Sequence, residues 1–224
     1  MSLKLWLLIS FFLCTSLHSF SSFNKFFTVM LGLPSNEKYM AGRTIDDCFE
    51  RGIALQFAEQ LKKNLEFYSG IRVIVSRYTE KNIESMHNAN FANRLNVDLY
   101  LSLHFFEEKQ EKPTLNIYRF LYHPVIDYWP LQSPQLSFIP YDQAHRQMIN
   151  ITQSYTEIFF NTLQSYQALF EIKGIFGLPF KPLIGIKSPA FALEASLKEK
   201  DSWKLYVEPM TTGIVEVYKR AINA

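Results

Sequence analysis

The sequence predicts a single-domain α/β protein in which a mostly parallel, twisted sheet carries helices on both faces. Short apolar segments alternate along the chain with longer segments whose apolar residues recur at helical spacing. One short segment, residues 97–104, is apolar at most positions, as a strand covered on both faces of a sheet is. Apolar residues make up 48% of the 224 positions, which is enough for one sizeable buried core.

The beginning of the chain, residues 1–22, predicts an export signal. Lys4 supplies a positive charge before the apolar stretch 5–13, and that stretch is shorter than a helix that spans a bilayer. Small residues follow it, as they do near a signal cleavage site. An uncleaved N-terminal membrane anchor is the alternative. In either case we expect residues 25–224 to form the folded domain.

The first half of the domain predicts alternating strands and helices. Thr44 is a suitable N-cap for a helix whose apolar residues recur every four positions, and Gly70 follows its expected end. The expected strands are residues 24–31, 71–76, 97–104 and 114–122, and the expected helices are residues 44–68 and 80–95.

The second half predicts longer helices. The longest is expected over residues 142–170. The last is expected over residues 202–222, with a bend at Pro209, because proline cannot donate a backbone hydrogen bond within a helix. Strands are expected at residues 182–186 and 190–194.

An irregular insertion is expected over residues 123–140. This segment contains four prolines and Trp129, and it shows neither helical nor strand periodicity. Long unstructured segments inside a compact domain often serve as lids or binding loops. The insertion is therefore either a lid or docking loop, or a surface loop packed on its own aromatic residues.

Composition excludes several classes of function. The net charge is only +2, and no basic stripe of the kind that binds nucleic acid is present. With 8 glycines and no glycine-rich phosphate loop, the chain shows no nucleotide-binding motif. Once residues 1–22 are removed, Cys48 is the only cysteine, so no internal disulfide frames the fold. We expect Cys48 to be a buried helix residue.

A histidine at the end of a predicted central strand is the first candidate for chemistry. Side chains alternate along a strand, so Ser102 and His104 point to the same face. In α/β folds, ligands bind at the carboxyl ends of the strands. His104 is therefore a candidate metal ligand or acid–base group, and a structural core histidine is the alternative.

Two glutamates are expected near the same edge of the sheet. Glu50 lies early in the first long predicted helix, and Glu194 ends the strand 190–194. A glutamate within the apolar run around Glu194 is costly to bury without a partner, which points to a functional role. For Glu50, a solvated helix face is an equally good interpretation.

Four blocks of residues extend this pattern along the chain. They are Glu50 with Leu55 and Ala58, the strand end 73–77 followed by Glu80, the pair Ala92-Asn93 followed by residues 97–104, and residues 189–194. In this order and at this spacing, the blocks resemble the zinc-dependent N-acetylmuramoyl-L-alanine amidases of bacterial cell-wall turnover, type 3. The resemblance covers about residues 27–222. It implies an α/β fold of the amidase/phosphorylase-hydrolase type.

The resemblance also implies a mechanism. In that family a zinc ion held by His, Glu and His activates a water molecule, and a glutamate at a late strand end acts as general base and then as general acid. Matched position by position, Glu50 and His104 would be zinc ligands and Glu194 the catalytic carboxylate. The bond cut would join N-acetylmuramic acid to the L-alanine of the stem peptide.

The same resemblance implies where the protein acts and with what. We expect a bacterial protein exported to the periplasm or cell envelope, with peptidoglycan as its partner. A cell-division or envelope protein is a further candidate partner.

The chain departs from the family pattern at the first zinc ligand. The family has a histidine in the loop after the first strand, whereas residues 31–36 contain none. A catalytic zinc ion usually has three protein ligands, so a substitute would be needed. The candidates are Asn36, Glu37, His87, His123 and His145.

Three hypotheses therefore stay open. The first is an exported zinc amidase with an altered metal site, favoured by the joint presence of Glu50, His104 and Glu194. The second is a catalytically inactive amidase-like domain that binds peptidoglycan or a cell-division partner, favoured by the missing histidine. The third is an α/β interaction domain whose matches to the family are accidental.

Overall fold

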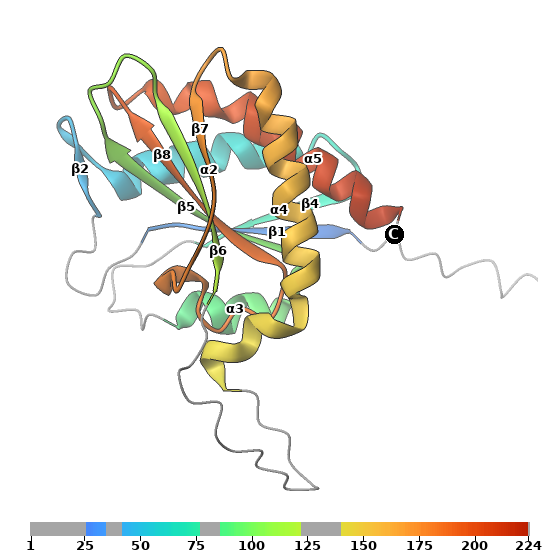
Figure 1. Ribbon diagram of the computed structural model, residues 1–224. Helices are drawn as coiled ribbons and strands as arrows, with labels where there is room; N and C mark the ends of the chain where they lie inside the picture. Colours follow the sequence, from blue (N-terminus) through green and yellow to red (C-terminus); the bar gives the residue numbers. More distant parts are fainter. Residues whose placement is uncertain (1–25, 35–41, 77–85, 122–139, 224) are drawn as a thin grey trace, which may run out of the picture.

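The central element of the computed structural model, which describes residues 26–34, 42–76, 86–121 and 140–223, is a sheet (Figure 1). Within these residues it has six strands in the order β4-β1-β5-β8-β6-β7. They are β1 (Phe27–Gly32), β4 (Ile71–Val75), β5 (Leu99–Glu107), β6 (Thr114–Phe120), β7 (Glu171–Leu178) and β8 (Ala190–Leu197). Strands β4, β1, β5 and β8 are parallel, whereas β6 is antiparallel to β8 and parallel to β7. The predicted fold class is confirmed.

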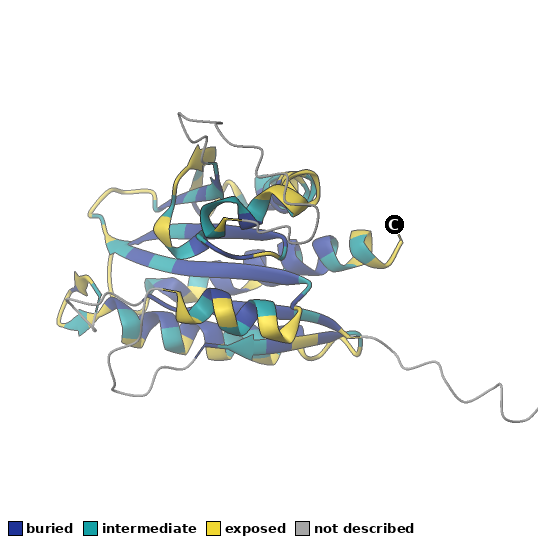
Figure 2. Cartoon of the chain, turned by 90° about the horizontal axis from the view of Figure 1, so that it is seen from below, coloured by how far each residue is buried: buried dark blue, intermediate teal, exposed yellow. Residues whose placement is uncertain are grey.

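Helices cover both faces of this sheet, and their outer sides carry most of the exposed residues (Figure 2). The α-helices are α2 (Glu50–Leu65), α3 (His87–Leu95), α4 (Ile149–Leu163) and α5 (Val207–Ile222). The 3-10 segments are Tyr141–Met148, Gln164–Tyr166, Lys181–Leu183 and Ser202–Tyr206. In the described part of the chain, no helix is long and apolar enough to cross a membrane.

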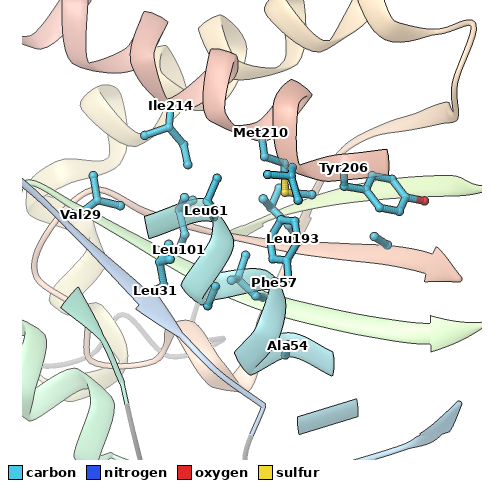
Figure 3. Packing of buried hydrophobic residues seen from close by; sticks show 14 of the residues in the cluster. Val29, Leu31, Ala54, Phe57, Leu61, Leu101, Leu193, Tyr206, Met210 and Ile214 are labelled. Atoms are coloured by element: carbon cyan, nitrogen blue, oxygen red, sulfur yellow. The ribbon is translucent and has the colours of Figure 1, made fainter. Parts of the chain in front are cut away.

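The larger core lies between the sheet and helices α2, α4 and α5. Figure 3 shows side chains from α2 and α5, such as Leu61 and Ile214, above Leu101 of β5 and Leu193 of β8. Ala54, also in α2, is fully buried in the same cluster, and its small side chain lets this helix approach the sheet closely. A smaller core fills the other face, where α3 packs.

The side-chain alternation along β5 places the histidine of interest. Leu99, Leu101 and Leu103 belong to the larger core, whereas Tyr100 belongs to the smaller one. Ser102 and His104 share the parity of Tyr100, so they lie on the face of α3, toward the carboxyl end of the strand.

The helix expected over residues 44–68 begins later than predicted, at Glu50. Residues before Glu50 form a small antiparallel hairpin, β2 (Thr44–Ile45) and β3 (Cys48–Phe49), whose turn includes Asp46 at φ +51°. Aspartate tolerates this left-handed conformation better than most residues do. Cys48 therefore lies half-exposed in a strand rather than buried in a helix.

Three expectations in the second half also need correction. The helix expected over residues 142–170 is a 3-10 segment followed by α4, and strand β7 then begins at Glu171. Residues 182–186 form no strand, because a 3-10 turn occupies the start of this segment. Pro209 lies in the first turn of α5, after another 3-10 segment, where a missing backbone N–H is harmless.

Several expectations fall on residues that the structure does not describe. These are the export signal over residues 1–22, residues 80–85 of the second expected helix, and residues 123–139 of the insertion. They remain predictions.

Candidate functional site

The three site residues expected from the sequence lie together at the carboxyl edge of the sheet. His104 of β5 and Glu194 of β8 are direct neighbours in the parallel register. Glu50 is the first residue of α2, and its carboxylate approaches the end of β5. The topology thus brings one histidine and two glutamates from three elements to one edge, where α/β proteins bind ligands.

His104 is held by two polar neighbours. Its Nε2 lies 2.8 Å from the Ser102 hydroxyl, and its Nδ1 lies 3.5 Å from Oε1 of Glu50. The edge of its ring packs at right angles on Phe180, with 5.3 Å between the ring centroids. These contacts fix the orientation of the imidazole, and they suit both a ligand-binding histidine and the structural core histidine of the alternative interpretation.

Glu50 is nearly fully buried, with 3% of its surface exposed. Its Oε1 accepts the backbone N–H of Phe105 at 3.0 Å, and its Oε2 accepts that of Arg43 at 3.1 Å. Burial alone would raise the pKa of the Glu50 carboxyl, but the hydrogen bonds from His104, Arg43 and Phe105 outweigh it, so this pKa lies below its usual value. Glu50 is therefore a charged group inside the fold, not a solvated helix residue.

Glu194 has both of its oxygens engaged. The Arg43 guanidinium donates to Oε1 at 2.8 Å, and the Tyr118 hydroxyl donates to Oε2 at 2.8 Å. The Glu194 side chain is 16% exposed and that of Arg43 is 54% exposed, so solvent reaches this ion pair. Glu194, the glutamate predicted to need a partner, therefore has two.

Tyr118 joins the site from strand β6. Burial, followed by the adjacent Glu194 carboxylate, raises the pKa of Tyr118 to about 12. The hydroxyl therefore keeps its proton at neutral pH and acts as a donor to Glu194. Its ring stacks on Phe180, with 5.1 Å between centroids, and also contacts Phe176 of β7.

The described residues do not make up a catalytic zinc site. The 3.5 Å between Nδ1 of His104 and Oε1 of Glu50 would suit two ligands of one zinc ion, since zinc lies about 2.0–2.1 Å from nitrogen and oxygen ligands. However, within the described ranges no group of three His, Cys, Asp or Glu side chains could hold a metal. A guanidinium, which cannot bind a cation, is instead paired with Glu194.

The candidates for a third ligand lie in different places. His145 packs on Phe120, with 4.7 Å between ring centroids, and His87 begins helix α3. Neither completes a metal-binding group with described residues. Asn36, Glu37 and His123 lie outside the described residues.

Arg43 and Tyr118 are site residues that the sequence did not predict. Alternation along the predicted strand 114–122 could have placed Tyr118 on the same face as residue 116, which pairs with Glu194 in the antiparallel register. No sequence signal marked Arg43, which lies just before the helix expected from residue 44.

Other residues in the family-like blocks support the backbone around the site. Ser76 accepts the backbone N–H of Leu33 at 3.0 Å and so joins β4 to the end of β1. Asp98 accepts the backbone N–H of Thr28 at 2.8 Å, which fixes the start of β5 against β1. Ser76 and Asp98 therefore have structural roles in their blocks.

Fold and site together define an α/β protein with a histidine–carboxylate cluster at the carboxyl edge of its sheet. The family model described as N-acetylmuramoyl-L-alanine amidase matches residues 35–209, which is most of the chain. The chain therefore belongs to this family and is a peptidoglycan hydrolase-like protein. A search of curated proteins found no match.

Solved structures support the same fold. The N-acetylmuramyl-L-alanine amidase Ami1 from Mycobacterium smegmatis superposes with a TM-score of 0.62 at 14% identity, covering 88% of this chain and 98% of that one. An N-acetylmuramoyl-L-alanine amidase from Clostridium difficile gives 0.61 at 18% identity, with 88% and 98% covered. The catalytic domain of the amidase CwlV from Paenibacillus polymyxa gives 0.60 at 14% identity, with 86% and 98% covered.

Proposed function

We propose that this domain recognises peptidoglycan at the junction of N-acetylmuramic acid and L-alanine, and that it holds this junction without zinc-dependent cleavage. Membership of the N-acetylmuramoyl-L-alanine amidase family supports peptidoglycan as the ligand. The observation that carries the proposal is the pairing of Glu194 with Arg43 and Tyr118, which occupies the carboxylate expected to act as general base. A protein of this kind would work outside the cytoplasm, in the cell envelope of a bacterium, where an envelope protein could be a further partner.

A second candidate is hydrolysis of the same amide by an altered metal site. It is favoured by the Glu50–His104 spacing, which suits two zinc ligands. In that case Glu194 would be the catalytic carboxylate, and the third ligand would come from outside the described residues.

Sedimentation with purified sacculi tests the binding proposal. We expect the domain to sediment with sacculi, and we expect Glu194→Gln to weaken binding at least tenfold, a loss of about 1.4 kcal/mol. Glu171→Gln removes a matched exposed carboxylate from β7 and should leave binding unchanged. Equal sedimentation of the two variants would contradict the proposed site.

Mass spectrometry of the soluble products separates the two candidates. Binding without cleavage predicts no release of stem peptides beginning with L-alanine and no stoichiometric zinc in the purified protein. Stem peptide release that is lost in Glu194→Gln, together with one zinc ion per chain, would overturn the first candidate and establish the second.

A further inference from the structure

The feature that the family pattern leaves unexplained is Arg43. Its guanidinium carries five N–H donors in a fixed plane, and one of them donates a hydrogen bond to Oε1 of Glu194. The ring of Phe106 lies beneath it, 5.9 Å from Cζ to the ring centroid. More than half of the side chain is exposed, so a ligand can reach the remaining donors.

The backbone around Arg43 is fixed at several points. Its N–H donates to Glu50, and its carbonyl accepts the N–H of Glu50 at 2.8 Å. The tip of the following hairpin is held by Lys200, whose backbone N–H donates to Asp46 at 2.8 Å and whose Nζ lies 3.1 Å from Asp47. The β2–β3 hairpin that follows Arg43 is thus held at its base by Glu50 and at its tip by Lys200. These contacts fix the position of Arg43.

We propose that Arg43 and Glu194 form a donor–acceptor pair that binds one extended peptide residue through its backbone N–H and C=O. An extended residue directs both groups to the same side, as it does toward a neighbouring antiparallel strand. Nη1 of Arg43 donates to Oε1 of Glu194 at 2.8 Å, so the remaining N–H donors of the guanidinium lie beside the remaining lone pairs of the carboxylate. The carboxylate accepts the ligand N–H, and the guanidinium donates to the ligand C=O.

This inference rests on the proposed function and names the ligand residue. In a muramoyl peptide, the residue would be the L-alanine attached to the lactyl group, so Glu194 accepts the N–H of the amide that the family cuts. The stacked rings of Phe180 and Tyr118 form an apolar wall beside the pair. Such a pair binds an uncleaved amide, and its two charges come from the Arg43 and Glu194 side chains.

Titration calorimetry with N-acetylmuramoyl-L-alanyl-D-isoglutamine tests the pair. We expect Arg43→Gln to weaken binding at least tenfold and Arg43→Lys, which keeps a charged donor, to weaken it less. Arg146→Gln removes an exposed arginine on the 3-10 helix Tyr141–Met148 and should bind as the wild type does. Wild-type affinity in Arg43→Gln would overturn the inference.

An N-methylated probe tests the role of Glu194 separately. Methylation of the L-alanine nitrogen removes the N–H, so the wild type should bind this probe at least tenfold more weakly than the parent compound. Glu194→Gln should show a smaller loss on methylation, because the two changes remove parts of the same interaction. Equal losses in the two proteins would overturn the assignment.

The sacculus experiment distinguishes the failure of this inference from failure of the proposed function. If sacculus binding depends on Glu194 but the Arg43 variants bind the probe normally, only the donor–acceptor pair is wrong. If the domain does not sediment with sacculi, the proposed function itself fails.

Discussion

At the scale of single residues, Glu50 combines a structural and a chemical role. It is buried, charged and bonded to two backbone N–H groups, one in the loop before β2 and one at the end of β5. Gly42, at φ +76°, lies against the same carboxylate, where a Cβ atom would come within 2.9 Å of Oε2. The carboxylate therefore joins the loop of Arg43 to the strand of His104, whether or not a ligand is bound.

Replacing this carboxylate should destabilise the protein. We expect Glu50→Ala to lower the free energy of unfolding by about 2–4 kcal/mol, because one buried and one partly buried N–H group lose their acceptor. Gln56→Ala changes an exposed polar residue of the same helix and should stay within about 0.5 kcal/mol of the wild type. Urea denaturation measures both values, and equal stability of the two variants would show that Glu50 has no structural role.

The imidazole of His104 is oriented by Ser102, its neighbour two residues earlier. We expect Ser102→Ala to change the 15N chemical shift of Nε2, because this nitrogen loses its hydrogen-bond partner at 2.8 Å. Ser165→Ala, at an exposed site after α4, is the control and should leave the His104 signals unchanged. An unaltered Nε2 shift in Ser102→Ala would show that the hydroxyl does not orient the ring.

At the scale of elements, the sequence predicted central strands well and edge elements poorly. Strands β5 and β8 are apolar on both faces, so their composition identifies them, and the alternation along β5 correctly placed Ser102 and His104 on one common face. Strand β7 lies at the edge of the sheet, is largely exposed, and contains Gly174 at φ +141°, so no hydrophobic pattern marked it. The hairpin before α2 was missed because its apolar residues, Ile45 and Phe49, continue the four-residue spacing of the helix.

Helix α3 is joined to the segment before β8 by one side chain. Asn93 donates from Nδ2 to the carbonyl of Gly185 at 2.8 Å and accepts the N–H of Lys187 at 2.9 Å. We expect Asn93→Ala to lower the free energy of unfolding by about 1–3 kcal/mol, since both backbone groups lose a partner. Thermal unfolding should show little change for Asn90→Ala, an exposed residue of the same helix, and a similar small change in Asn93→Ala would contradict this role.

At the scale of the whole molecule, the layered core and the site differ in how well the sequence predicts them. The four adjacent parallel strands and three of the helices share one continuous apolar cluster, which the pattern of apolar residues predicts from sequence. The site depends on contacts between residues far apart in the chain, such as Arg43 with Glu194, and no local pattern encodes these. The fold was therefore predictable from sequence, whereas the charge partner of Glu194 was not.

The stability of the whole domain should depend on this core more than on the edge of the sheet. Leu193 of β8 is 1% exposed and lies beneath α2 and α5, so we expect Leu193→Ala to lower the free energy of unfolding by about 2–5 kcal/mol through lost packing and a cavity. Leu178, at the end of edge strand β7, is 45% exposed, and Leu178→Ala should change it by less than about 1 kcal/mol. Urea denaturation of both variants gives the comparison, and an equal loss at the two positions would show that the cluster beneath α2 and α5 is not the main source of stability.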